Sequence, residues 1–334
     1  MTDDWSTFGR RSRRVPHHGP SEDERLTHGL PLTLRPVEDP GAAQRPVFDP
    51  ALKQHPHAYR ASDPRFTDPA PATAWLAARR RAMDLVLAAI ADSPWVDSLV
   101  LRGSVLLRAW FGGQAREPGD LDFVVLPVDR EFRSGWTATV LSGIAAAAER
   151  TAGRDTGPVR FTAGAAVAED IWTYERVPGR RLVLPWTAEG LPGGTVQLDF
   201  VFNEPLPAPP EPMAVPGLER SGDAVLYAAT PELSLAWKLL WLLTDSYPQG
   251  KDLRDAVLLA EHSPLRPELL REVLAGGGEE VPPIGPDTLA LLGHDVEWGH
   301  FVTEYPAFAD REAEHLARLR AALAPTFAEL PAPA

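Results

Sequence analysis

The fold is decided by residues 98–127, which begin Ser98-Leu99-Val100-Leu101-Arg102-Gly103-Ser104-Val105-Leu106-Leu107-Arg108 and end Gly119-Asp120-Leu121-Asp122-Phe123-Val124-Val125-Leu126-Pro127. The apolar run before Gly103 predicts a strand, and the glycine and serine predict a turn into a short helix. Gly112 and Gly113 mark the end of that helix, and the alternating residues after Gly119 predict a second strand. The stretch is therefore expected to fold as strand, Gly-Ser turn, helix and strand.

Two aspartates on the second strand share one face. Asp120 and Asp122 alternate with Leu121 and Phe123. On a strand with a period of two residues, both carboxylates face one way and both apolar side chains face the core. Their Cα atoms are expected about 6.6 Å apart, at about 3.3 Å per residue. Carboxylates this close repel each other unless a cation lies between them. The pair therefore indicates a divalent metal site, and Mg²⁺ usually shares such a site with substrate phosphates. A hairpin with two exposed aspartates is the alternative.

The Gly-Ser turn supplies groups that bind phosphate. Gly103 lets the backbone approach a phosphate closely, because it has no side chain. Ser104, at the start of a helix, offers a hydroxyl and backbone N–H groups. The unit therefore predicts a phosphate-binding turn beside a metal-binding pair.

Composition narrows the class of protein. The 334 residues suffice for one large or two ordinary domains. No run of about 18 apolar residues and no charged-then-apolar leader occurs, so neither a membrane nor a secreted protein is expected. The lack of cysteine excludes disulfides and thiolate metal sites and favours the cytoplasm. A net charge of −13 argues against a broadly basic nucleic-acid-binding surface and leaves room for a local basic patch.

Proline and glycine divide the chain into four parts. Residues 1–70 are expected to be an irregular, proline-rich extension. Residues 71–203 form the core, with helices expected at 73–91 and 131–150 and with strands at 159–167, 170–176, 181–186 and 195–203. Residues 204–222 contain six prolines and are expected to be a linker. Residues 223–334 are expected to be a helical lobe. The predicted fold class is α/β, a mixed sheet with flanking helices followed by a C-terminal helical lobe.

The helix expected at residues 232–243 is apolar on nearly every side. Its polar exceptions, Ser234, Lys238 and Asp245, form one stripe on a helix of 3.6 residues per turn. Lysine is rare in the chain, since Lys53, Lys238 and Lys251 are its only lysines. A lysine on a buried helix needs an anionic partner. This partner is either a protein carboxylate or a nucleoside triphosphate.

Together these residues resemble the polymerase-β-like nucleotidyltransferase superfamily, and within it the AbiEii/AbiGii toxin family. One part of the resemblance is Leu-x-Gly-Ser-x-Leu-x-Arg at residues 101–108, followed by Asp-Leu-Asp-Phe at 120–123. The other part is Lys238 on a helix, followed by Lys251-Asp252-x-x-Asp255, where the family has Arg-Asp-x-x-Asp. The resemblance covers roughly residues 75–265.

Two positions depart from the family pattern. Lys251 stands where arginine is usual. The family often has Arg-x-Ser-x-Asp before the metal pair, whereas this chain has Pro118 at the serine position of residues 116–120. Pro118 removes a hydroxyl and a backbone N–H there.

The resemblance implies a metal-dependent nucleotidyltransferase that moves a nucleoside monophosphate from an NTP to an acceptor hydroxyl and releases pyrophosphate. It implies that Asp120 and Asp122 hold two Mg²⁺ (or Mn²⁺) ions, about 3.5–4 Å apart in such sites. Asp199, a lone carboxylate on an apolar strand, would share one ion. The alternative for Asp199 is a structural aspartate capped by backbone N–H groups.

The same resemblance assigns the nucleotide contacts. Gly103, Ser104 and Lys238 would hold the β- and γ-phosphates, and Asp252 joins Lys238 among the catalytic residues. Most of the catalysis would be positioning and neutralisation of charge.

The biological role implied by the resemblance is that of a cytoplasmic toxin acting on the 3′ end of tRNA and held in check by an antitoxin. Residues 10–14, residues 79–81 and the pair Lys251 and Arg254 are the candidates for contacts with tRNA phosphates. Two alternatives remain open. One is a small-molecule nucleotidyltransferase of the antibiotic-resistance type, and the other is a catalytically silent nucleotide-binding interaction module.

Overall fold

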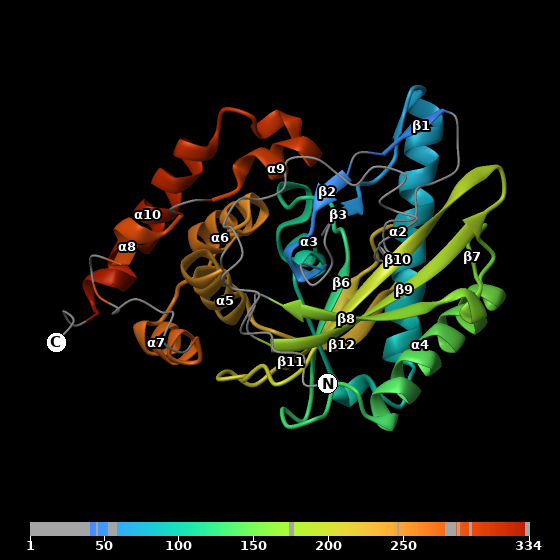
Figure 1. The fold of residues 1–334 in the computed structure, drawn as a ribbon, viewed down its shortest axis with the longest axis horizontal. Helices are drawn as coiled ribbons and strands as arrows, with labels where there is room; N and C mark the ends of the chain where they lie inside the picture. The colour runs from blue at the N-terminus through green and yellow to red at the C-terminus, as the bar shows by residue number, and fades with distance from the viewer. Residues whose placement is uncertain are drawn as a thin grey trace, which may run out of the picture.

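A mixed eight-stranded sheet forms the centre of the protein (Figure 1). The structure is a computed structural model that describes residues 41–44, 46–52, 59–173, 177–245, 247–277, 285, 288–293 and 296–330. The sheet order is β11 (Glu211–Pro216), β12 (Asp223–Ala228), β5 (Leu99–Arg102), β6 (Leu121–Val125), β10 (Leu191–Val201), β9 (Val177–Ala188) and β7 (Arg160–Phe161), while β8 (Val167–Thr173) also pairs with β9. Strand β10 runs parallel to β6 and β12 runs parallel to β5, whereas the other pairs are antiparallel.

Helices flank the sheet and extend beyond it. Helices α2 (Pro69–Ala91) and α4 (Gly135–Arg154) pack against each other, and α2 also contacts β10 and β12. The short helix α3 (Ser104–Phe111) joins β5 to β6. The C-terminal helices lie to the left of the sheet in Figure 1: α5 (Pro231–Thr244), α6 (Gly250–His262), α7 (Pro267–Ala275), α8 (Thr288–Leu291), α9 (Trp298–Glu304) and α10 (Glu312–Ala328). The α/β fold class expected from the sequence is confirmed.

The central strands are apolar because both of their faces are covered. All four residues of β5 are buried, and so are Leu121 and Phe123 of β6. The ring of Phe123 stacks on that of Phe200 on the parallel neighbour β10, with ring centroids 5.6 Å apart. This packing holds β6 and β10 rigidly side by side, which matters because both strands carry aspartates.

Local capping explains where the main helices begin. Ser134 accepts a hydrogen bond from the backbone N–H of Thr137 at the start of α4, and Thr230 does the same for Leu233 at the start of α5. Helix α2 begins at Pro69, four residues before the expected start, because proline is well accommodated in the first turn of a helix.

Two segments differ from the expected division of the chain. The expected linker, residues 204–222, contributes β11 to the sheet, and the expected helical lobe begins with strand β12. Prolines are tolerated in β11 because it is an edge strand, where one row of N–H groups needs no partner. Among the described residues of 41–70, two short strand pairs, β1 (Ala42–Ala43) with β4 (Arg65–Phe66) and β2 (Pro46–Phe48) with β3 (Tyr59–Ala61), replace part of the expected irregular chain, whereas residues 1–40 of that expected extension lie outside the described residues. These strands are too short to give a periodic sequence pattern.

Candidate active site

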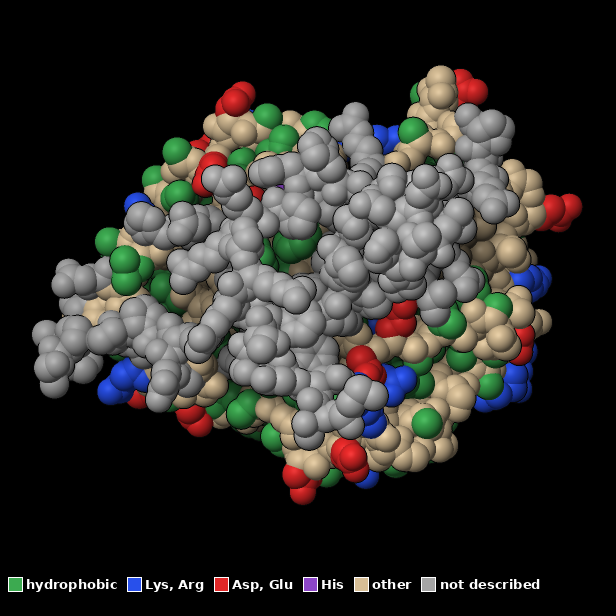
Figure 2. All heavy atoms as spheres, in the orientation of Figure 1, with side chains coloured by type: hydrophobic (Ala, Val, Ile, Leu, Met, Phe, Trp, Pro, Cys, Tyr) green, Lys and Arg blue, Asp and Glu red, His purple; other side chains and the backbone are tan. Residues whose placement is uncertain are grey.

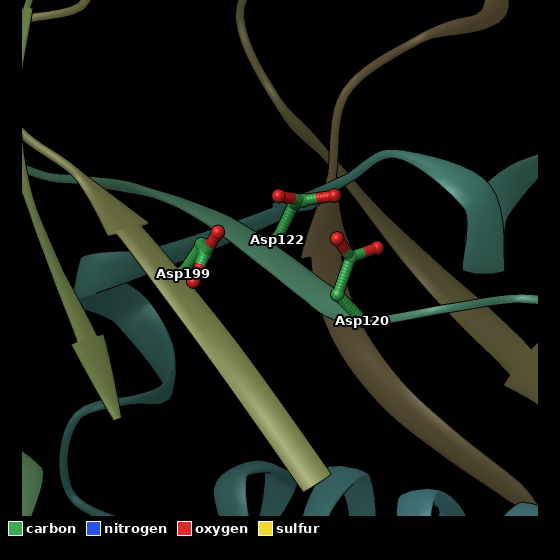
Figure 3. Close-up of side chains that lie close together, drawn as sticks. All are labelled: Asp120, Asp122 and Asp199. Atoms are coloured by element: carbon green, nitrogen blue, oxygen red, sulfur yellow. The ribbon is translucent and has the colours of Figure 1, made fainter. Parts of the chain in front are cut away.

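Three aspartates meet where β6 and β10 lie side by side (Figure 3). Asp122 lies on β6, Asp120 directly precedes this strand, and Asp199 lies on β10. The parallel register places Asp199 opposite Asp122, so both side chains point to the same side of the sheet. One carboxylate oxygen from each of the three residues lies within 4.8 Å of the others. The structure thus brings together the three aspartates that the sequence singled out, and we call them the aspartate cluster.

The aspartate cluster concentrates negative charge. Burial, together with the charges of Asp120 and Asp199, raises the pKa of Asp122 to about 7. Burial also raises the pKa of Asp199, and the adjacent Arg181 offsets part of this rise. A divalent cation would relieve the repulsion, and a set of carboxylate oxygens suits Mg²⁺ or Mn²⁺. The residues present therefore fit the divalent metal that the resemblance implies.

The Gly-Ser turn lies against Asp122. Gly103 has a φ of 84°, which residues with a side chain rarely adopt. A Cβ atom at Gly103 would also lie 2.4 Å from Oδ2 of Asp122. Ser104 is the first residue of α3 and is buried, and its Oγ has no hydrogen-bond partner among the described residues. The turn thus sets a helix N-terminus, which favours anions, beside the aspartate cluster.

Lys238 lies on α5 with protein carboxylates as partners. Its Nζ lies 2.6 Å from Oδ1 of Asp252 and 3.3 Å from Oδ2 of Asp255, both on α6. Asp255 also accepts hydrogen bonds from Arg116, which is in the segment before Asp120. Of the two partners that the sequence left open for Lys238, a protein carboxylate is present. Asp252 thus contacts Lys238 and is not a member of the aspartate cluster.

An open pocket of about 1130 Å³ surrounds these groups, counted out to its mouth. We call it the main pocket. The aspartate cluster, Gly103, Lys238 and Lys251 contribute to its lining, together with residues 47–51 and residues of α9. Lys251, which the sequence placed beside the site, lines the main pocket.

A second, more polar pocket adjoins the main pocket at Asp120. It measures about 780 Å³, counted in the same way, and we call it the side pocket. The two pockets share the following five lining residues: Arg116, Asp120, Gln197, Lys251 and Glu304. Asp120 is the one member of the aspartate cluster that lines both pockets.

Two residues that the sequence analysis missed support Asp199: Arg181 contacts it directly, and Asp49 contacts Arg181. Arg181 of β9 donates from Nε and Nη2 to the two carboxylate oxygens of Asp199, at 2.8 and 2.7 Å. Its Nη1 donates to Asp49 at 2.7 Å. The expected strand at residues 181–186 includes Arg181, but its pairing with Asp199 depends on the antiparallel register of β9 and β10. No local signal points to Asp49.

The arginines at residues 79–81 are engaged with other groups of the protein. Arg79 donates to the carbonyl oxygen of Gly119 at 2.9 Å, and Arg80 forms a two-point ion pair with Glu117. Arg81 forms a similar pair with Asp155. These contacts make residues 79–81 weak candidates for a tRNA-binding patch. The other candidate run, residues 10–14, lies outside the described residues.

Arg254, the last candidate for a contact with tRNA phosphates, contacts other groups of the protein. Arg254 donates to the carbonyl oxygen of Gln114 at 2.6 Å, and its guanidinium carbon lies 4.9 Å from the centroid of the Phe308 ring. On the face in Figure 2, basic side chains lie among acidic ones around the rim of the described surface. This mixture agrees with the net charge of −13, which indicates local rather than broad positive charge.

Comparison with known proteins assigns the family. Residues 85–329 match the model of a family described as "Nucleotidyl transferase AbiEii toxin, Type IV TA system". The chain belongs to the AbiEii family. Among solved structures, MenT4, a nucleotidyltransferase toxin from Mycobacterium tuberculosis, aligns with 17% sequence identity and a TM-score of 0.43. That alignment covers 76% of this chain and 94% of MenT4. A search of curated proteins gave no match.

Membership of the AbiEii family makes the chain a nucleotidyltransferase toxin that uses an NTP. The Gly-Ser turn, the aspartate cluster, Lys238 and Asp252 all lie inside the matched span, whereas Asp49 lies before it. Across the part of the chain that the structure describes, every helix is too short or too polar to cross a bilayer.

Proposed function

We propose that this AbiEii protein transfers a nucleoside monophosphate from an NTP to a hydroxyl group at the 3′ end of tRNA. Asp120, Asp122 and Asp199 would hold Mg²⁺ or Mn²⁺, and the toxin would act in the cytoplasm under the control of a cognate antitoxin. One observation carries the proposal. Three carboxylates lie within 4.8 Å of one another beside a Gly-Ser helix start, in the main pocket of a chain from a nucleotidyltransferase family.

The residues of the chain divide the work between binding and orientation. The backbone at Gly103 and the N-terminus of α3 bind phosphate oxygens, because neither needs a side chain to approach them. Ser104 supplies a buried hydroxyl whose hydrogen-bonding capacity is unused among the described residues. Divalent ions, when bound, activate the acceptor hydroxyl and neutralise charge on the phosphates.

Lys238 completes the phosphate site. Asp252 and Asp255 hold its ammonium group at the wall of the main pocket, and they leave one of its three N–H donors for a ligand. We therefore assign Asp252 the role of orienting Lys238. A lysine fixed in this way contributes positive charge to the triphosphate without first losing side-chain freedom.

The side pocket is the proposed place of the acceptor. It meets the main pocket at Asp120, so an acceptor hydroxyl there lies next to the aspartate cluster while the NTP occupies the main pocket. Lys251 and Tyr305 line it and can contact a phosphate or ribose. An RNA end is a polar, narrow group that suits such a space.

A small cationic acceptor is the second candidate. Four carboxylates, namely Asp63, Glu117, Asp120 and Glu304, line the side pocket together with three cationic side chains. The lining thus carries a small excess of negative charge, which favours a positively charged compound over RNA. This composition supports the small-molecule alternative that the sequence left open.

Labelling with nucleotides tests the proposal. The protein is incubated with each of the four α-labelled NTPs and Mg²⁺, with either total tRNA or a set of aminoglycoside-type hydroxyl compounds. We expect label on tRNA from one or two NTPs, with none from Asp122→Asn and none in excess EDTA. Labelling should also fall steeply with added salt, because phosphate contacts dominate the affinity for RNA.

Each part of the proposal has its own contrary result. Labelling that persists in excess EDTA contradicts the metal site. Transfer to a small compound with none to tRNA moves the assignment to the second candidate. NTP binding without transfer to any acceptor favours a catalytically silent interaction module.

A further inference from the structure

Arg181 is a buried cation held by carboxylates from two distant parts of the chain. It is 2% exposed, and it lies opposite Asp199 in the antiparallel pairing of β9 with β10. Its guanidinium donates twice to Asp199 and once to Asp49, at 2.7 to 2.8 Å. With its side-chain amide oxygen turned toward Arg181, Gln197 also accepts from Nη2 at 3.0 Å. A guanidinium so deeply buried needs such partners, because an unpaired buried charge costs many kcal/mol.

Asp49 is itself held in place by the segment around it. It follows β2 and precedes a 3₁₀ turn at Pro50–Leu52. One oxygen, Oδ1, accepts from the backbone N–H of Ala51 at 3.2 Å, and the other, Oδ2, accepts from Arg181. The carboxylate thus has a fixed orientation before Arg181 is considered. It reaches the site from a position that precedes the family match by more than thirty residues.

The two contacts to Asp199 determine how its carboxylate can bind a metal. A carboxylate offers about four lone-pair directions. Arg181 uses one on each oxygen of Asp199, and it thereby stops the carboxylate from rotating. One direction on each oxygen remains, and the oxygens of Asp120 and Asp122 lie within 4.8 Å. Arg181 also offsets one negative charge, so the three carboxylates can be held together before an ion arrives.

We propose that Asp49 and Arg181 are positioning residues of the metal site. Asp49 accepts from Nη1, the guanidinium nitrogen of Arg181 that does not contact Asp199, and thereby fixes the guanidinium. Arg181 in turn holds Asp199 in its metal-binding orientation. Residues 47–51, which also line the main pocket, therefore complete an active site whose other parts come from the AbiEii domain. This inference rests on the proposed function, since it takes the aspartate cluster to be a metal site.

The test measures Mn²⁺ binding to the full-length protein without nucleotide, by electron paramagnetic resonance and calorimetry. Asp49→Ala leaves Nη1 of Arg181 without its carboxylate and should weaken Mn²⁺ binding about tenfold or more, as is typical for groups that orient metal ligands. Asp49→Asn should bind Mn²⁺ nearly as tightly as wild type, because its amide oxygen still accepts from Nη1. The matched control is Asp155→Ala, which breaks the two-point pair with Arg81 outside both pockets and should leave Mn²⁺ affinity unchanged.

Circular dichroism and thermal melting accompany each variant. Should Asp49→Ala fail to fold, Arg181→Lys replaces it, because it keeps the charge but cannot bond both oxygens of Asp199 and Asp49 at once. It should show the same loss of Mn²⁺ affinity. Wild-type Mn²⁺ affinity in a folded Asp49→Ala or Arg181→Lys protein overturns the inference and leaves the three residues a structural ion cluster.

The failure of the proposed function looks different. In that case the wild-type protein binds no Mn²⁺, or Asp122→Asn binds it as tightly as wild type does. Loss of binding in Asp122→Asn together with unchanged binding in Asp49→Ala would keep the metal site and reject only the role of Asp49.

Discussion

The Asp122→Asn variant probes the charge of the aspartate cluster without changing its shape. In the folded protein the pKa of Asp122 is raised from 3.8 to about 7, first by burial and then by the charges of Asp120 and Asp199. The folded protein therefore retains a proton that the unfolded chain releases at lower pH. This makes the wild-type protein lose stability as pH rises from about 4 to about 7, because the unfolded state binds fewer protons than the folded state there.

The size of the effect follows from the change in pKa. Asp122 is ionised above about pH 7 and protonated below about pH 4. Its ionisation therefore lowers the free energy of unfolding by about 4 kcal/mol between these two pH ranges. Solvent around this half-buried side chain screens part of that cost, so we expect about 2–4 kcal/mol. Asparagine carries no charge at any of these pH values. The variant should therefore gain stability over wild type, in the absence of metal, by this amount between about pH 4 and about pH 8.

Urea denaturation in EDTA, at about pH 4 and about pH 8, measures the difference in unfolding free energy between Asp122→Asn and wild type. Ionisable groups outside the aspartate cluster titrate alike in both proteins, so their contributions cancel in the comparison. Asp120 and Asp199 titrate together with Asp122, so the measured difference belongs to the aspartate cluster as a whole. Asp129→Asn is the control, since it removes one carboxylate from an exposed position and should change stability by less than about 0.5 kcal/mol. Mg²⁺ should stabilise the wild type, by about 2.7 kcal/mol at a hundred times its dissociation constant, and should leave Asp122→Asn unaffected. An advantage of Asp122→Asn that is equal at both pH values would refute the electrostatic reasoning.

Four further substitutions test other parts of the site and fold. Gly103→Ala forces a Cβ against Asp122 at an unfavourable φ and should abolish both Mn²⁺ binding and transfer, whereas wild-type transfer would show that the turn can relax. Lys238→Ala should cost about 3–5 kcal/mol of stability by breaking a buried ion pair, and should lower kcat/KM by about tenfold or more. Adding Asp252→Asn should restore part of that stability but not the transfer, and recovery of both would make Lys238 purely structural. Asp84→Ala leaves three backbone N–H groups of residues 218–220 unpaired and should lower the free energy of unfolding by about 3 kcal/mol, as measured by urea denaturation. Asp84 lines neither pocket, so the initial rate of labelling by the folded variant should stay near that of wild type.

Sequence patterns predicted those parts of the site that lie within one short unit of structure. The order of strand, turn, helix and strand over β5, α3 and β6 follows from an apolar run, a Gly-Ser pair and a glycine break. The shared face of Asp120 and Asp122 follows from the two-residue period of a strand. Such features are local, because backbone conformation and the alternation of side chains depend on neighbouring residues alone.

Asp199 shows where local reasoning ends. The sequence predicts a strand that carries it, but its place opposite Asp122 depends on the parallel pairing of β6 with β10. Helix α4 and strands β7 to β9 separate these two strands along the chain. Many registers keep the apolar residues of β10 in the core, and only the packing of the whole sheet selects the one that brings the carboxylates together.

By itself, then, the sequence determined the Gly-Ser turn, the aspartate pair on its strand, and the apolar helix with one lysine. Tertiary structure alone decided that Lys238 lies against Asp252 and Asp255. It also decided that Arg181 contacts both Asp199 and Asp49, although Asp49 lies 132 residues before Arg181 in the chain. The physical reason is that a buried charge must have a partner, and its identity depends on which distant segments pack within hydrogen-bond distance. Periodicity along one segment carries no information about that distance.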